Sequence, residues 1–249
     1  MRAVAFAVAL SQSLAAAAQA QTPRTYDDPV PRDQAGLSRE RVLATFERLA
    51  YGEAPAADSP GRLTRWSEDE VGVHWEGTLG RNDIHGERPW YAEVHAFIDE
   101  LDDVEGVPRL MTYFNSNSFD IWVYLLARSE IAERMEQFDD NYRRWLSQDC
   151  GIADGQDGPL IFIKYDLSIP EVRSCIVTMM IKSMGFIETA DVEELEGSAI
   201  DMTPDYPYLT NLDYYLLRIL YDDRYDPSLP HNEGMAAANR IADELIAAN

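Results

Sequence analysis

Positive charge and lysine are scarce in this 249-residue sequence. Lysine occurs only at Lys164 and Lys182, and 21 basic residues face 44 acidic ones, which gives a net charge of −23. A surface of that charge repels nucleic acid and anionic lipid, so we expect neither as a partner. The charge itself favours solubility. Attraction of cationic partners or of Ca²⁺ is the alternative, although no EF-hand-like loop is present.

Long apolar runs are also lacking after residue 20, where no stretch approaches the roughly 18 apolar residues of a membrane-spanning helix. The first twenty residues combine a basic start at Arg2, a short apolar stretch and an Ala18-Gln19-Ala20 end. These are the three parts of a secretory signal. We therefore expect a signal peptide over 1–20, cleavage before Gln21, and a periplasmic or secreted mature protein without a transmembrane segment.

Cysteine occurs only at Cys150 and Cys175. An exported protein meets an oxidising compartment, where two cysteines usually pair, so we predict a disulfide between them. A loop of this size contributes on the order of 3 kcal/mol in the chain-entropy model. A metal site on two cysteines would need further nearby ligands, and no C-x-x-C motif occurs.

Hydrophobic periodicity and turn residues predict the order of the elements. Helices are expected to begin at Ser38, Pro89, Ser129, Ser168, Thr210 and about Asn232. Strands are expected near 71–75, 109–114, 119–126 and 160–165, with a turn at 115–118 and a Gly/Asp-rich loop at 149–158. The fold class is therefore α+β, a small mixed sheet with packed helices and a C-terminal helical segment. After the signal peptide we expect an extended segment over 21–37 and a single domain over 38–249.

The helix that begins at Ser168 is the most informative element. Ser168 and Glu171 fit a capping box, and Gly185 is placed to end the helix. Its middle is apolar on nearly all sides, which predicts burial in the core. One polar stripe remains, formed by Glu171, Ser174, Thr178 and Lys182.

Two parts of the sequence match a known pattern. They include Cys175-Ile176, Met184-Gly185, Ser198, Leu209-Thr210, Asp213, Leu216-Leu217-Arg218 and Leu220-Tyr221-Asp222, with Arg65-Trp66 earlier in the chain. The pattern resembles a family of exported alphaproteobacterial proteins grouped as a domain of unknown function. That family resembles zincin-like metallopeptidases around one helix. The resemblance implies a zincin-like architecture.

The zinc-binding pattern of such enzymes, H-E-x-x-H-x-x-G-x-x-H, is degenerate here. Its positions fall on Thr178, Met179, Lys182, Gly185 and Glu188. Gly185 is unchanged, and among the others only Glu188 is able to ligate a metal. A zinc site needs about three protein ligands, a lysine ammonium repels Zn²⁺, and a methionine cannot act as a base. We therefore expect no metal, no cofactor and no catalytic residue at this helix.

Other chemistries find little support. His74, His85, His95 and His231 include no i, i+4 pair, and no nucleotide-binding loop occurs. Thr178 with Lys182 suits a hydroxyl nucleophile in principle, but neither G-x-S-x-G nor S-x-x-K is present. Lys182 is read as solvated or ion-paired beside the acidic loop 191–196, or as a recognition point for a carboxylate ligand. The tyrosines between 206 and 225 serve in packing, or form an aromatic surface for peptide or glycan.

The leading hypothesis is an exported, non-catalytic protein, a pseudoenzyme with a degenerate zincin-like core that binds a protein or other envelope or secreted macromolecule. One alternative is a peptidase-like hydrolase that acts on peptide or cell-envelope polymer through an unrecognised site. Another is a purely structural envelope protein. An open cleft over Thr178 and Lys182 would favour ligand binding, and a filled one would favour a scaffold.

Overall fold

The computed structural model describes residues 37–77, 89–113, 120–127, 129–131, 148–155, 158–164, 167–186, 198–201 and 208–247. The predicted signal peptide, most of the extended segment 21–37, the acidic loop with Glu188, His85 and Tyr206 lie outside these residues. Of the helix predicted from Ser129, residues 129–131 are described and are helical. No helix in the described part of the chain is long and apolar enough to cross a membrane.

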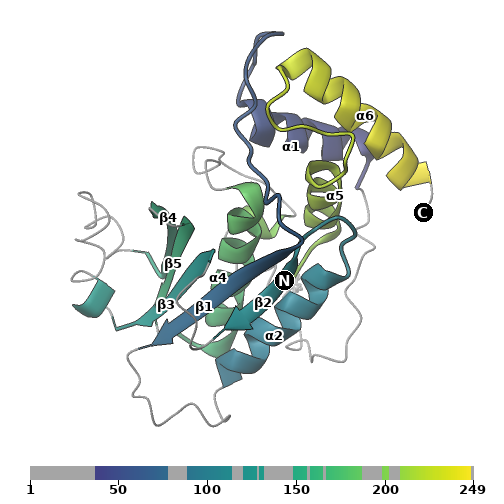
Figure 1. Cartoon of the computed structure of the whole chain (residues 1–249). Helices are drawn as coiled ribbons and strands as arrows, with labels where there is room; N and C mark the ends of the chain where they lie inside the picture. The colour runs from purple at the N-terminus through teal and green to yellow at the C-terminus, as the bar shows by residue number, and fades with distance from the viewer. Residues whose placement is uncertain are drawn as a thin grey trace, which may run out of the picture.

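The described residues form a mixed sheet with packed helices (Figure 1), which confirms the predicted α+β class. The helices are α1 (Arg39–Tyr51), α2 (Pro89–Asp102), α4 (Ile169–Ile181), α5 (Asn211–Leu220) and α6 (His231–Ala247). The strands are β1 (Glu70–Gly77), β2 (Arg109–Tyr113), β3 (Ile121–Leu126), β4 (Cys150–Gly155) and β5 (Gly158–Lys164).

The order of strands in the sheet is β2-β1-β3-β5-β4. The neighbours from β2 to β5 run parallel, and β4 runs antiparallel to β5. The predicted turn at 115–118 lies outside the described residues, and the strands on either side of it, β2 and β3, are not neighbours in the sheet because β1 lies between them and pairs with both. β2 pairs with β1 over Glu70–His74 and β3 pairs with it over Val73–Gly77. Alternation and turn residues mark a strand but not its partner.

The prediction of a loop over 149–158 is corrected, because strand β4 lies within this segment. Its sequence, CGIADG, is rich in residues that disfavour strands. Pairing with β5, from Cys150 opposite Ile163 to Gly155 opposite Gly158, supplies the order that local propensity does not.

Helices α2 and α4 cover one face of the sheet. Side chains at alternate strand positions point into this layer, among them Val71, Val73, Ile121, Val123, Ile161 and Ile163. The opposite face carries a second apolar cluster, Tyr124, Leu126, Ile131, Ala153, Leu160 and Phe162, with Trp122 partly buried beside it. Over β3, β4 and β5 the sheet is thus apolar on both faces.

Helices α5 and α6 form the predicted C-terminal helical segment, and the N-terminal helix α1 packs on both of them. In α1, the apolar residues Val42, Phe46 and Leu49 recur at helical spacing and are buried. In α6, Ile241 is buried, whereas Met235, Leu245 and Ile246 are half-buried. One continuous apolar cluster connects these helices with α4 and the sheet.

Candidate functional site

Helix α4 enters the core directly after its first turn. The Glu171 carboxylate accepts hydrogen bonds from the Ser168 N–H (2.7 Å) and the Ser168 hydroxyl (2.6 Å), which confirms the predicted capping interaction. The hydrogen bond from the Ser168 hydroxyl lowers the pKa of this exposed carboxyl. Every residue of the run 172–181 is buried, so the prediction of a helix surrounded by the core is confirmed.

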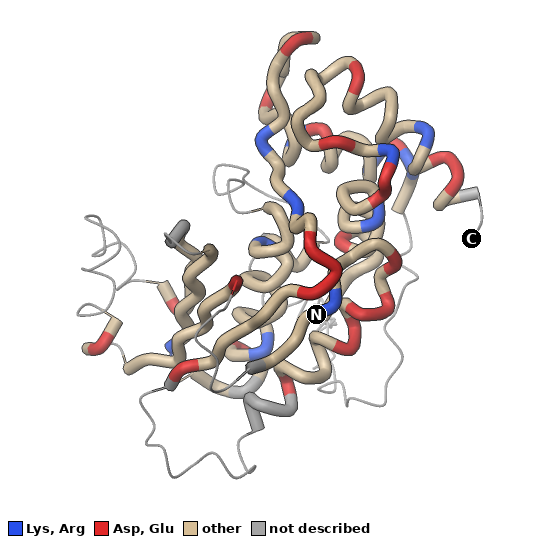
Figure 2. The backbone as a smooth tube through the Cα atoms, in the orientation of Figure 1, with Lys and Arg blue, Asp and Glu red and all other residues tan. Residues whose placement is uncertain are grey.

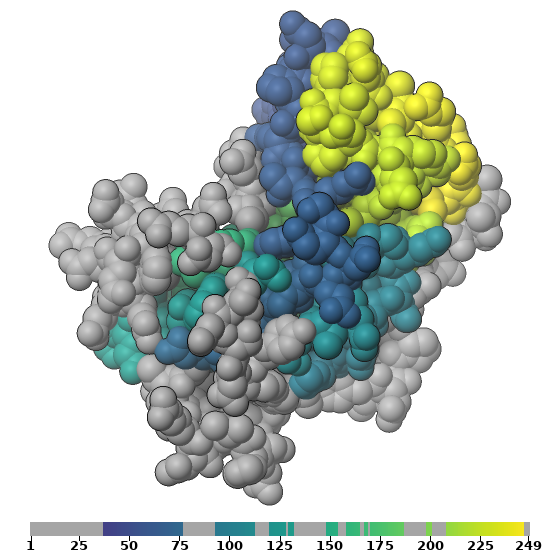
Figure 3. Space-filling model, in the orientation of Figure 1, coloured from purple at the N-terminus to yellow at the C-terminus, as the bar shows by residue number. Residues whose placement is uncertain are grey.

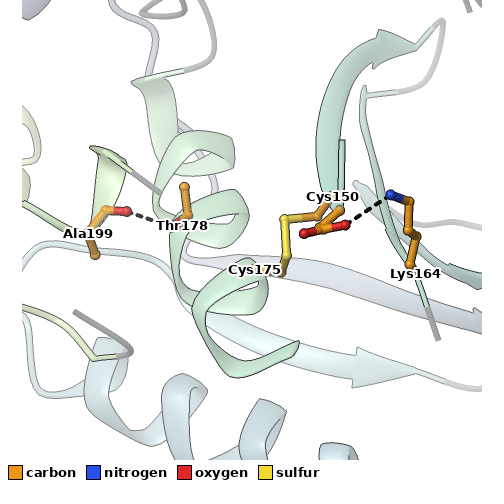
Figure 4. Close-up of a disulfide and its surroundings, with 6 residues drawn as sticks. Cys150, Lys164, Cys175, Thr178 and Ala199 are labelled. Atoms are coloured by element: carbon orange, nitrogen blue, oxygen red, sulfur yellow. Dashed lines mark hydrogen bonds and ion pairs between the residues drawn. A yellow bond between two sulfur atoms is a disulfide. The ribbon is translucent and has the colours of Figure 1, made fainter. Parts of the chain in front are cut away.

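The polar stripe of α4 is largely covered by other segments of the same chain. Thr178 is 1% exposed, and its hydroxyl donates to the carbonyl oxygen of Ala199 at 2.6 Å (Figure 4). Ala199 belongs to a short 3₁₀ turn, Ala199–Asp201, that packs on α4. Met179 is 1% exposed within the main apolar cluster, and Lys182 is half-buried. The place over Thr178 is therefore filled.

These residues do not fit a zinc ion. The Thr178 hydroxyl is used as a donor to a carbonyl, Met179 offers a thioether inside the core, and Lys182 carries a positive charge. Zinc takes nitrogen, thiolate or carboxylate ligands, about three of them from the protein. The described part of the chain contains no group of three or more His, Cys, Asp or Glu side chains arranged to hold a metal ion.

The other side of α4 is fastened to the edge of the sheet. Cys175 and Cys150 of β4 form the predicted disulfide, with a Cα–Cα distance of 5.9 Å. Figure 4 shows Cys175 and Thr178 leaving α4 on different sides, Cys175 toward β4 and Thr178 toward Ala199. Close by, the buried Lys164 ammonium lies 2.9 Å from the Asp149 carboxylate. These contacts hold β4 against both its neighbours.

The 3₁₀ turn over Thr178 is pinned by a buried carboxylate. Asp213 of α5 is fully buried, and its oxygens accept from the N–H groups of Ala199 and Thr210, both at 3.0 Å. The hydroxyls of Thr210 (2.7 Å) and Ser198 also donate to this carboxylate. Burial raises the pKa of Asp213, and the hydrogen bond from Ser198 leads the opposing effects. Thr210 and Asp213 thereby form a capping box at the predicted start of α5.

The carbonyls of the turn that follows α4 accept hydrogen bonds from distant segments. After Ile181 the chain makes a π turn, Lys182–Phe186, in which Gly185 has a φ of 125°. The carbonyls of residues 183, 184 and 185 accept in turn from the Trp66 indole (3.0 Å), the Tyr221 hydroxyl (2.9 Å) and the Thr64 N–H (3.3 Å). In Figure 3 the blue segment leading into β1 lies between the yellow C-terminal helices and the teal α2. We call this meeting of α4, α5, residues 64–66 and the segment 198–201 the joint.

A family model described as "Protein of unknown function (DUF2927)" matches residues 39–238. The chain belongs to this family. No curated protein and no solved structure matches the chain.

In this DUF2927 protein, several of the residues that carry the sequence resemblance lie at the joint. Ser198, Thr210 and Asp213 bond to one another, and Tyr221 bonds to the end of α4. Arg65 donates to the carbonyl oxygens of Leu220 and Asp222 at the end of α5. Each of these contacts fixes one segment against another, so the shared pattern describes packing of the helical segment on α4.

One buried ionic group was missed in the sequence. Arg173 of α4 lies 2.8 Å from the Glu93 carboxylate and 3.0 Å from that of Glu100, both on α2. Glu100 also accepts from the Leu209 N–H at 3.0 Å, so the group links α2, α4 and the entry of α5. The signal was available, because Arg173 is an isolated charge in an apolar helix. Its partners are seven positions apart on another helix and could not be identified from spacing.

The structure does not bring the described histidines together. His74 of β1 contacts the Trp122 ring edge-on at a centroid distance of 4.7 Å, and His95 is exposed on α2. His231 of α6 lies 2.6 Å from the Glu47 carboxylate of α1. Of the described tyrosines, Tyr221 and Tyr225 are buried in the core, whereas Tyr208, Tyr214 and Tyr215 are half-buried. Packing therefore accounts for the two buried rings.

Proposed function

We propose that this DUF2927 protein is an exported, non-catalytic protein whose zincin-like core serves as a scaffold for binding an envelope or secreted macromolecule. The observation that carries the proposal is the state of α4. Where a zincin would place a ligand and a general base, Thr178 bonds to Ala199 and Met179 lies in the core. A catalytic zinc site keeps one open coordination position for water, whereas here the 3₁₀ turn covers the helix.

Two further observations support export and the single-domain organisation. Residues 1–20 read as a signal peptide, and a disulfide with both cysteines buried suits an oxidising compartment. The continuous apolar cluster from α1 and α6 to the sheet supports one domain over 38–249. The zincin-like relationship is supported by the sequence pattern around α4 and by the packing of this helix on a mixed sheet.

The filled position over Thr178 directs the search for a partner to the outer surface. A ligand that entered at Thr178 would have to displace Ala199, whose N–H is held by the buried Asp213 carboxylate. Lys182 is the half-buried end of the stripe, so its role is testable by substitution. Among the described residues, no cluster favours the alternative of a hydrolase.

The test uses the mature protein, residues 21–249, purified from the periplasm. Metal analysis is expected to find far less than one zinc per chain, and capture from envelope extract is expected to retain a defined partner. Lys182→Ala is expected to leave that capture unchanged. About one zinc per chain, or hydrolysis of a casein or peptidoglycan substrate that a chelator abolishes, would overturn the non-catalytic assignment.

A further inference from the structure

Strand β2 is an edge strand with one bonded side. The N–H of Arg109 donates to the carbonyl of Asp69 (2.9 Å), and the register places Arg109 opposite Glu70. Alternate residues of a strand direct their backbone groups to opposite neighbours. Leu110 and Thr112 therefore point their N–H and C=O groups away from β1. Within the described residues, no strand pairs with this outer edge.

The outward groups of β2 are not equivalent. The Leu110 N–H faces the Asp102 carboxylate, which accepts a hydrogen bond from it. No described residue forms a hydrogen bond with the Thr112 N–H or with the Leu110 C=O. In a parallel pair, one residue of an added strand would donate its N–H to the Leu110 C=O and would accept a hydrogen bond from the Thr112 N–H. A strand bound here would begin beside Asp102.

The start of this edge is strongly acidic. Glu68, Asp69 and Glu70 are exposed where the chain enters β1, and Asp102 and Asp103 are exposed at the end of α2 (Figure 2). Burial raises the pKa of Asp102; Arg109, 3.9 Å away, opposes this rise and Asp99 adds to it. A second cation placed there would relieve the repulsion between these carboxylates.

The devices that usually protect an edge strand are weak in β2. Proteins block free edges with proline, bulges, inward charges or lysines. The sequence of β2, RLMTY, carries a single charge at its first position. The opposite edge differs, because β4 holds two glycines and an aspartate and is fixed to α4 by the disulfide. β2 is thus the edge more suited to accept a strand.

We infer that the outer edge of β2 binds an extended cationic segment of another protein, which adds to the sheet as a further strand. This inference rests on the proposed binding function and specifies its partner class. A second copy of this chain fits poorly, because two molecules of net charge −23 would repel one another. Main-chain bonds to Leu110 and Thr112 would supply affinity, and the acidic residues would select basic side chains.

The probe is a labelled peptide of about ten residues that alternates Lys and Val, titrated into the mature protein at low ionic strength. Thr112→Pro removes the outward N–H without removing a bond to β1, and Thr112→Val is the matched control that keeps it. We expect Thr112→Pro to weaken binding at least about tenfold and Thr112→Val to leave it within about twofold. A Glu/Val peptide should not bind.

Two outcomes would overturn the inference. One is equal binding of the Lys/Val peptide by wild type and folded Thr112→Pro, which would indicate charge attraction without strand addition. The other is dimerisation of the wild type, in sedimentation, that Thr112→Pro abolishes. If Thr112→Pro does not fold, a Lys/Val peptide N-methylated at alternate residues replaces it. Unweakened binding of that peptide in both methylation registers also refutes the inference.

Capture from envelope extract tests the proposed function separately from the inference about β2. If wild type and Thr112→Pro capture the same macromolecule from envelope extract equally well, the binding function stands and its assignment to β2 fails. If wild type captures nothing and binds no Lys/Val peptide, both fail.

Discussion

Replacement of Asp213 tests how firmly the joint is held. Its carboxylate is the shared acceptor for Ala199, Thr210 and Ser198, all of them buried. Asp213→Ala removes the acceptor and leaves these donors inside the protein. Asp213→Asn keeps an oxygen for the two backbone N–H groups, and its amide can donate to the Ser198 hydroxyl.

The magnitude follows from the donors that cannot turn away. The hydroxyl of Ser198 can rotate, whereas the N–H groups of Ala199 and Thr210 are fixed by the backbone. A buried donor without an acceptor costs about 1–3 kcal/mol, so Asp213→Ala should lose about 2–6 kcal/mol of unfolding free energy. Asp213→Asn should lose less than about 1.5 kcal/mol, the scale of one hydrogen bond. A domain is stable by about 5–15 kcal/mol, so the first loss is large.

The assay is urea unfolding of the mature, disulfide-bonded protein at pH 7, with equal m-values as the condition for comparison. Asp223→Ala is the matched control, since Asp223 is exposed on the turn after α5, and should stay within about 0.5 kcal/mol of wild type. A loss below about 1 kcal/mol for Asp213→Ala, or equal losses for the Ala and Asn variants, would refute the reasoning.

A comparison of wild type with Asp213→Asn also tests the titration of Asp213. Burial raises its pKa in the folded state, so the folded protein holds this proton more tightly than the unfolded chain. The stabilisation linked to that proton is complete below the ordinary pKa, about 4, and is lost as pH rises through the folded-state value. The unfolding free energy of wild type relative to Asp213→Asn should therefore increase as pH falls toward about 4.

Three further changes test other contacts. Cys150→Ser with Cys175→Ser should lower the unfolding free energy by about 3 kcal/mol in urea, because the unfolded chain regains the entropy of the open loop; an unchanged midpoint would contradict this. Gly185→Ala should lower it by more than about 2 kcal/mol, because φ is 125° and the new Cβ would lie 2.0 Å from the Thr64 carbonyl oxygen; a melting temperature equal to wild type would contradict this. Arg173→Met should lose about 3–5 kcal/mol of unfolding free energy, because it leaves the carboxylates of Glu93 and Glu100 without their cation; a loss below about 1 kcal/mol would contradict this.

Local signals predicted the helices well. Ser38 caps α1 by accepting from the Arg41 N–H (3.2 Å), and Thr210 and Ser168 act at the starts of α5 and α4 as their sequences indicate. Capping depends on residues three positions apart, so a sequence contains the whole interaction. The apolar circumference of α4 likewise predicted its burial. The disulfide followed from the oxidising compartment expected for an exported protein and from the absence of other cysteines.

Non-local pairing set the limit of that reasoning. The position of β1 between β2 and β3 depends on contacts between segments far apart in the chain, and no local pattern encodes it. β4 was missed because Gly151 and Gly155 disfavour a strand, and its order comes from β5 and the disulfide. Thr178 stood in a polar stripe, yet the segment that covers it comes from twenty-one positions further along.

The 3₁₀ turn that covers α4 excludes a metal ligand at position 178. A histidine at position 178 would need room that the 3₁₀ turn occupies, and it would leave the Ala199 carbonyl without its donor. Overpacking a buried position costs about 1–3 kcal/mol before any metal binds. Moving the turn aside would also break its bonds to Asp213. A single substitution therefore cannot place a metal ligand at this position, because the contacts of the joint would have to be rebuilt with it.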